Sequence, residues 1–85
     1  MRIIISSKAA KKLDKLNPFV KKKVLDVLNK VESGEKVDIK KMSGKKEEFR
    51  IRVGNYHIIM DKVSKDEYLA TNIGKRENIY FFDFI

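Results

Sequence analysis

The chain has 85 residues, with 20 Lys and Arg against 12 Asp and Glu, a formal net charge of +8 and no cysteine. This length predicts a single domain over residues 1–85 with one small core, and excludes a large enzyme with a separate cofactor domain. The absence of cysteine excludes disulfides, thiol nucleophiles and cysteine-ligated zinc. A small chain without cysteine fits the reducing cytoplasm, which is where we expect this protein. No apolar run is long enough to span a membrane, and no signal-peptide layout is present.

The first part of the chain predicts one strand and two helices. Residues 1–6 hold the β-branched run Ile3–Ile5, which is typical of a short buried strand. Ser6 or Ser7 can cap a helix that ends at Asn17-Pro18. The second helix is predicted from about Pro18 to Glu32, because Asn favours the N-cap, Pro favours the first helical position, and Ser33-Gly34 favours a helix end. Their apolar faces comprise Ala9, Ala10, Leu13 and Leu16 in the first helix, and Phe19, Val20, Val24, Val27, Leu28 and Val31 in the second.

The remainder of the chain predicts a loop followed by strands. Residues 35–46 are polar and rich in lysine, which favours a loop. Residues 47–53 alternate between apolar and charged side chains, as in a half-buried strand, and residues 56–61 form the return strand after Gly54-Asn55. A charged turn at residues 62–67 precedes a third strand at 68–73, which Gly74 is expected to end. This order, β-α-α-β-β-β, predicts an α+β fold: an N-terminal strand and a helical hairpin, then antiparallel strands forming one sheet.

The predicted hairpin places three polar side chains together. A two-residue turn at Gly54-Asn55 pairs Arg52 with His57 and Arg50 with Ile59, so the two arginines and the histidine share one face. Phe49, Ile51, Val53, Tyr56, Ile58 and Met60 then share the opposite face, which we expect to form the core under the helices. Like charges that are adjacent on a sheet repel each other. An anionic phosphate, an acidic partner or plain solvation could relieve that repulsion.

The positive charge is unevenly distributed along the chain. Residues 1–46 have a net charge of +9, and residues 47–85 have a net charge of −1. Only four of the 20 cationic residues are arginines, and three of them, Arg50, Arg52 and Arg76, lie in the second half. Because arginine presents a rigid fork of donors to a phosphate, this segment favours phosphate recognition. An ordinary solvated strand face and a solvated lysine face on the helices are the alternatives.

The chain resembles the RelE/ParE toxin superfamily. The resemblance rests on residues 49–59 (Phe-Arg-Ile-Arg-Val-Gly-Asn-Tyr-His-Ile-Ile), on residues 73–80 (Ile-Gly-Lys-Arg-Glu-Asn-Ile-Tyr), and on Lys41-Met42-Ser43-Gly44 after two helices. RelE-type members cut messenger RNA in the ribosomal A site without metal, whereas ParE-type members poison DNA gyrase. Both types are neutralised by a small acidic antitoxin.

The resemblance implies a RelE-like toxin of a type II toxin–antitoxin system, an endoribonuclease or mRNA interferase that needs no metal or other cofactor. Its implied partners are messenger RNA, the ribosome and an acidic RelB-like antitoxin, bound in a hetero-oligomer. The implied catalytic residues are Arg50, Arg52, His57, Arg76 and Tyr80, where His57 stands at a position that is often Arg in the family. We expect Lys41, Lys45, Lys46 and Lys75 to contact RNA.

The chemistry of such a site can be derived from the residue types. Cleavage of RNA by its own 2′-hydroxyl needs a proton acceptor, a proton donor and cations for the developing charge. The arginines supply fixed positive charge, which is often the largest single contribution, but they hold their protons too tightly to act as bases. The unperturbed pKa of a histidine such as His57, about 6.5, suits proton transfer near neutral pH. Tyr80 can stack on a base, or its hydroxyl can orient a phosphate. A ParE-like gyrase inhibitor and an inactive module that binds RNA or an antitoxin remain the alternatives.

Overall fold

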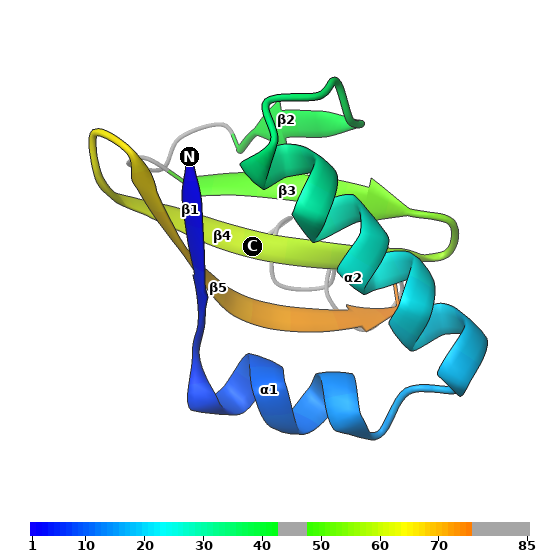
Figure 1. The fold of residues 1–85 in the computed structure, drawn as a ribbon. Coiled ribbons are helices and arrows are strands. Elements are labelled where there is room, and N and C mark those ends of the chain that lie inside the picture. Colours follow the sequence, from blue (N-terminus) through cyan, green and yellow to red (C-terminus); the bar gives the residue numbers. More distant parts are fainter. Residues whose placement is uncertain (43–47, 76–85) are drawn as a thin grey trace.

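The computed structural model describes residues 1–42 and 48–75, and its strands form a single sheet (Figure 1). The sheet has five strands in the order β1-β5-β4-β3-β2, where β1 lies parallel to β5 and the other neighbours are antiparallel. The α+β prediction is therefore confirmed. The elements, in chain order, are β1 (Arg2–Ile5), α1 (Ser7–Asp14), α2 (Pro18–Glu32), β2 (Ile39–Lys41), β3 (Glu48–Val53), β4 (Tyr56–Ser64) and β5 (Glu67–Lys75).

Both helices begin where the sequence places their caps. The Ser6 hydroxyl accepts a hydrogen bond from the Ala9 amide at 3.1 Å, and the Asn17 side chain accepts one from the Phe19 amide at 2.8 Å. Helix α2 runs from Pro18 to Glu32 as predicted, and Gly34 follows with a φ of 79°. Neither of the two described helices is long and apolar enough to cross a membrane.

The core lies between the two helices and one face of the sheet (Figure 1). Its buried side chains are Ala9, Leu13, Val24, Leu28, Val31, Ile51, Val53, Ile58, Met60, Tyr68, Ala70 and Ile73. Two predicted core positions are wrong. Phe19, in the first turn of α2, is 80% exposed, and Ile4 is 40% exposed because β1 is an edge strand whose side chains alternate between the core and solvent.

The hairpin of β3 and β4 has the predicted register. Arg52 pairs with His57, Arg50 with Ile59 and Ile51 with Ile58. Gly54 has a φ of 61° and Asn55 has a negative φ, which is the pattern of a type II′ turn with glycine at its first central position. This turn fixes which side chains face the helices and which face away from them, so it determines the composition of the polar face.

Three strand boundaries differ from the prediction. Residues 39–41, predicted as loop, form β2, because the Met42 and Arg52 amides donate to the carbonyls of Glu48 and Asp38 at 2.8 and 2.9 Å. Strand β4 continues to Ser64, so the turn is only residues 65–66. Strand β5 runs through Gly74 to Lys75, because Gly74 pairs with His57. At all three places, hydrogen bonds to a neighbouring strand extend the β-structure into residues whose polar side chains or glycine predict a loop or turn.

Candidate active site

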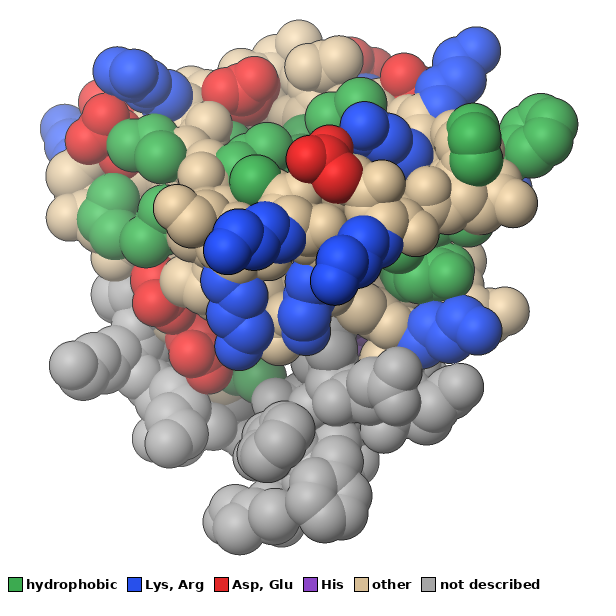
Figure 2. Space-filling model, turned by 90° about the horizontal axis from the view of Figure 1, so that it is seen from below, with side chains coloured by type: hydrophobic (Ala, Val, Ile, Leu, Met, Phe, Trp, Pro, Cys, Tyr) green, Lys and Arg blue, Asp and Glu red, His purple; other side chains and the backbone are tan. Residues whose placement is uncertain are grey.

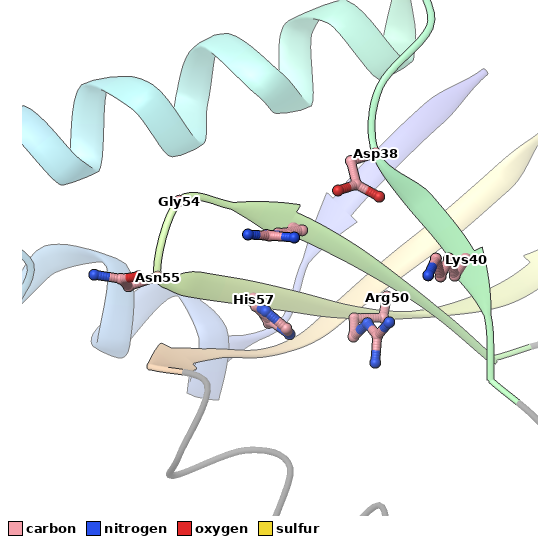
Figure 3. A pocket seen from close by; sticks show the side chains of 7 residues that line it. Asp38, Lys40, Arg50, Gly54, Asn55 and His57 are labelled. Atoms are coloured by element: carbon pink, nitrogen blue, oxygen red, sulfur yellow. The ribbon is translucent and has the colours of Figure 1, made fainter.

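The face of the sheet that points away from the helices holds a polar pocket (Figure 3). The pocket has a volume of about 220 Å³. Strands β2, β3 and β4 and the Gly54-Asn55 turn supply its lining, so three of the predicted site residues, Arg50, Arg52 and His57, come together as expected. The described residues that line it are Asp38, Lys40, Arg50, Arg52, Gly54, Asn55 and His57.

Two lining residues, Lys40 in β2 and Asp38 just before it, were missed by the sequence reasoning. Lys40 lies directly opposite Arg50 in the β2–β3 ladder, so both side chains are on the same face. Asp38 precedes β2, and its carbonyl accepts the Arg52 amide at 2.9 Å. Because residues 35–46 were predicted as a loop, no register could be assigned to them. The alternation of apolar Ile39 with charged Lys40 is consistent with a strand. Two residues are too few to predict a strand without knowledge of its partner β3.

The site residues differ in their contact with solvent. Arg52 is exposed and Arg50 is half-buried, whereas His57 is only 2% exposed. His57 is therefore buried, although it lies on the polar face of the hairpin. Its neighbours in the ladder are Arg52 on β3 and Gly74 on β5, and Gly74 has no side chain to occupy the space beside the imidazole.

The electrostatics of the pocket favour an anion. Among the described lining residues, Lys40, Arg50 and Arg52 contribute three positive charges and Asp38 contributes one negative charge. Within the described part of the chain, the side chains of Asp38, Lys40 and Arg52 form no ion pair. Cations held near one another repel, and a bound phosphate relieves that repulsion. No group of three His, Asp or Glu side chains in residues 1–42 and 48–75 is arranged to hold a metal ion.

Two predicted RNA-contacting residues, Lys41 and Lys75, do not line this pocket. Lys41 pairs with Phe49, and Lys75 pairs with Tyr56, so both lie toward the helix-covered face and both are exposed. Arg76, Tyr80, Lys45 and Lys46 lie outside the described residues. Their roles therefore stay predictions.

A second positive surface lies on α1. Figure 2 looks onto the molecule from the side of α1 and shows lysine and arginine side chains gathered on this face. Lys8, Lys11 and Lys15 are exposed, and Lys12 is half-buried. We call these four residues the lysine face. It shares no residue with the pocket.

The fold matches solved structures of RelE proteins. A chain in the RelB–RelE antitoxin–toxin complex from Methanococcus jannaschii is 29% identical, with a TM-score of 0.75 over 93% of this chain and 96% of that chain. The archaeal RelE–RelB complex from Pyrococcus horikoshii gives 23% identity and a TM-score of 0.69, over 88% and 93% of the two chains. The isolated RelE toxin from E. coli gives 18% identity and a TM-score of 0.72, over 96% and 93%.

No protein-family model matches the sequence, and no curated protein does. The structural matches nevertheless span nearly the whole of both chains. The predicted resemblance is therefore confirmed for its RelE branch, and the ParE branch is not needed to account for the fold. The chain is RelE-like.

Proposed function

We propose that this RelE-like chain is the toxin of a type II toxin–antitoxin pair and that it cleaves messenger RNA on the ribosome. The observation that supports the proposal is the pocket in which Lys40, Arg50 and Arg52 surround space for a phosphate beside His57. The 29% identity to a chain of an antitoxin–toxin complex supports the same assignment.

The proposed reaction is attack of a ribose 2′-hydroxyl on the adjacent phosphodiester. The phosphorus gains a fifth oxygen in the transition state, and negative charge accumulates on the oxygens that are not bridging. Arg50 and Arg52 are on one strand and share the face that holds the pocket, so both can donate to that charge. Such preorganised donors contribute roughly 10²–10³ in rate apiece. Arg76 and Tyr80 retain their predicted roles in charge stabilisation and in stacking.

The proposed partner is a small acidic antitoxin of the RelB type. The solved complexes from M. jannaschii and P. horikoshii each join a RelE to a RelB. With a net charge of +8, this chain attracts an acidic polypeptide over much of its surface. An antitoxin bound in a hetero-oligomer would hold the toxin inactive in the cytoplasm, where ribosomes are present.

The lysine face is proposed to contact the phosphate backbone of ribosomal RNA. Its exposed ammonium groups are strongly hydrated point charges, which suit contacts that are independent of sequence. The lysine face and the pocket have separate tasks in this proposal. The lysine face contributes affinity for a large polyanion, and the pocket carries out the chemistry.

Expression of the chain in the absence of an antitoxin tests the proposed function. Primer extension on cellular transcripts should reveal new 5′ ends inside open reading frames, and translation should stop. The variant Arg52→Ala should abolish both effects, whereas Arg2→Ala, at an exposed arginine in β1, should not. Intact messages together with DNA damage signalling would contradict the proposal, because that result is expected of a gyrase inhibitor.

A further inference from the structure

Asp38 is the carboxylate among the residues that line the pocket. From its position we propose that Asp38 is the general base of the cleavage reaction and takes the proton from the attacking 2′-hydroxyl. This inference rests on the proposed ribonuclease function and adds a residue that the sequence analysis did not select.

The backbone holds Asp38 in a defined place, while its side chain stays exposed. The Ile39 amide donates to the Val37 carbonyl at 2.9 Å, which closes a γ-turn centred on Asp38. The Asp38 carbonyl in turn accepts the Arg52 amide at 2.9 Å. These two hydrogen bonds fix the backbone next to a predicted phosphate ligand. The carboxylate forms no ion pair within residues 1–42 and 48–75, so its oxygens can accept a proton from substrate.

The other pocket side chains are poorer candidates for a base. Arg50 and Arg52 do not give up their protons in proteins, and the Lys40 ammonium has three donors and no acceptor. His57 can accept a proton, but it is 2% exposed and directly opposite Arg52 in the ladder. A proton received by Asp38 neutralises a negative charge. His57 then remains available as the proton donor on the other side of β3.

The positions of Asp38 and His57 suit an in-line displacement. Strand β3 lies between β2 and β4, so Asp38 and His57 approach the pocket from opposite sides of the strand that bears the arginines (Figure 3). Two strand spacings separate their backbones by about 10 Å, which leaves room for a phosphodiester between the side chains. The attacking and leaving oxygens of such a displacement also lie on opposite sides of the phosphorus.

The proposed step transfers two protons, one at each end of the displacement. The proton of the 2′-hydroxyl moves to the Asp38 carboxylate as the 2′-oxygen forms a bond to phosphorus. The bond from phosphorus to the 5′-oxygen then breaks, and that oxygen takes a proton from the imidazolium form of His57. The products are a 2′,3′-cyclic phosphate and a 5′-hydroxyl, while Asp38 ends protonated and His57 neutral. Exchange of protons with water restores both groups.

The competing explanation is that Asp38 only balances the charge of the pocket. In that case, removal of its negative charge would strengthen phosphate binding and leave the cleavage rate unchanged or raised. The two explanations therefore predict different cleavage rates for a variant without the Asp38 charge. General-base catalysis predicts a lower rate, and charge balance predicts an equal or higher one. Neither predicts weaker binding of RNA.

The experiment compares Asp38→Asn, Asp38→Glu and wild type on ribosomes that hold a defined message. Single-turnover cleavage rates are measured, together with binding of the same message carrying a 2′-deoxyribose at the cleavage site. General-base catalysis predicts a rate for Asp38→Asn lower by roughly 10²–10⁴-fold with unweakened binding, and partial recovery in Asp38→Glu. The matched control, Asp26→Asn, removes an exposed carboxylate of α2 and should behave as wild type.

Three results would overturn the inference. An Asp38→Asn rate equal to or above that of wild type would make Asp38 a charge-balancing residue. A loss of rate and binding together, with a lowered melting temperature and no recovery in Asp38→Glu, would make it structural. A wild-type protein that does not cleave would overturn the proposed function itself, and with it the role of Asp38. Cleavage by wild type and by Asp38→Asn alike would leave the proposed function standing.

Discussion

Arg50 and Arg52 occupy alternate positions on a strand, a pattern that is also typical of a solvated strand face. Their surroundings distinguish them from such a face. Lys40 lies opposite Arg50 on β2, and His57 lies opposite Arg52 on β4. Positive charges gathered in one place repel each other, and a bound phosphate would lower that electrostatic cost. We expect such a cluster where the site binds an anion.

The exposed position of Arg52 makes it the cleanest residue for a test of charge stabilisation. We predict that Arg52→Ala lowers the cleavage rate roughly 10²–10³-fold, because a preorganised donor to the developing charge is lost. The free energy of unfolding should change by no more than about 0.5 kcal/mol, as is usual at exposed positions. Single-turnover kinetics and urea denaturation measure the two effects.

The control for this prediction is Arg2→Ala. Arg2 lies 3.7 Å from Glu67 in an exposed ion pair, and such pairs contribute about 0–1 kcal/mol. Equal losses of rate in Arg2→Ala and Arg52→Ala would show that total charge matters and that the position of Arg52 does not.

At the scale of elements, the hairpin turn at Gly54-Asn55 contributes both to the stability of the sheet and to the lining of the pocket. Gly54 has a φ of 61°, and a Cβ placed on it would meet no atom within 4 Å. The cost of Gly54→Ala should therefore come from the backbone alone, about 1–2 kcal/mol in the free energy of unfolding. Because Gly54 also lines the pocket, we predict that cleavage falls as well. Urea denaturation and cleavage kinetics on the folded variant test this prediction.

Gly34 provides a matched control for the turn. It has a φ of 79° after α2, and a Cβ there would also meet no atom within 4 Å. Gly34→Ala should lose a similar amount of stability while its cleavage rate stays at the wild-type value. If both glycine variants lose activity equally, the effect of Gly54→Ala is general destabilisation.

The N-cap of α2 gives a prediction that concerns stability alone. Asn17→Ala removes the side-chain acceptor of the Phe19 amide and should cost about 1 kcal/mol in the free energy of unfolding. Asn29→Ala, at an exposed position inside the same helix, should be neutral or slightly stabilising, because alanine has the higher helix propensity. Chemical denaturation distinguishes them. A loss in Asn29→Ala as large as that in Asn17→Ala would contradict the capping argument.

The elements also show which features were accessible from sequence. Both helices and the hairpin register were predicted, because caps, turn residues and alternation are local signals. Strand β2 was not, since it is three residues long and exists through hydrogen bonds to β3. The same error hid Asp38 and Lys40 from the candidate site. The burial of His57 was also missed, because alternation assigns a face to a residue and does not indicate what covers that face.

At the scale of the whole molecule, two positive surfaces contribute to the net charge of +8. The lysine face on α1 is diffuse, while the cations of the pocket lie on the neighbouring strands β2 and β3 (Figures 2 and 3). Diffuse charge raises affinity for any polyanion and is screened by salt. Fixed charge in a pocket contributes to a single chemical step. The two surfaces should therefore respond differently to ionic strength and to mutation.

The salt dependence of RNA binding tests this division. We predict that replacement of Lys8, Lys11 and Lys15 by Gln lowers the slope of log affinity against log salt by about 2, since each phosphate contact contributes about 0.7 for single strands. A control variant with Lys30, Lys36 and Lys65 replaced by Gln removes the same charge from exposed positions elsewhere. Binding to ribosomal RNA is measured across a range of salt concentrations. Equal slopes in the two variants would contradict a dedicated lysine face.

The pocket on the face of the sheet that points away from the helices is proposed to cleave RNA by attack of the RNA's own 2′-hydroxyl. The most direct measurement is the analysis of end groups on fragments released from purified ribosomes that hold a defined message. The account predicts fragments with a 2′,3′-cyclic phosphate and a 5′-hydroxyl from the wild type, and none from a chain with both Arg50 and Arg52 replaced by Ala. Fragments with 5′-phosphate ends, or undiminished cleavage by the double variant, would contradict it.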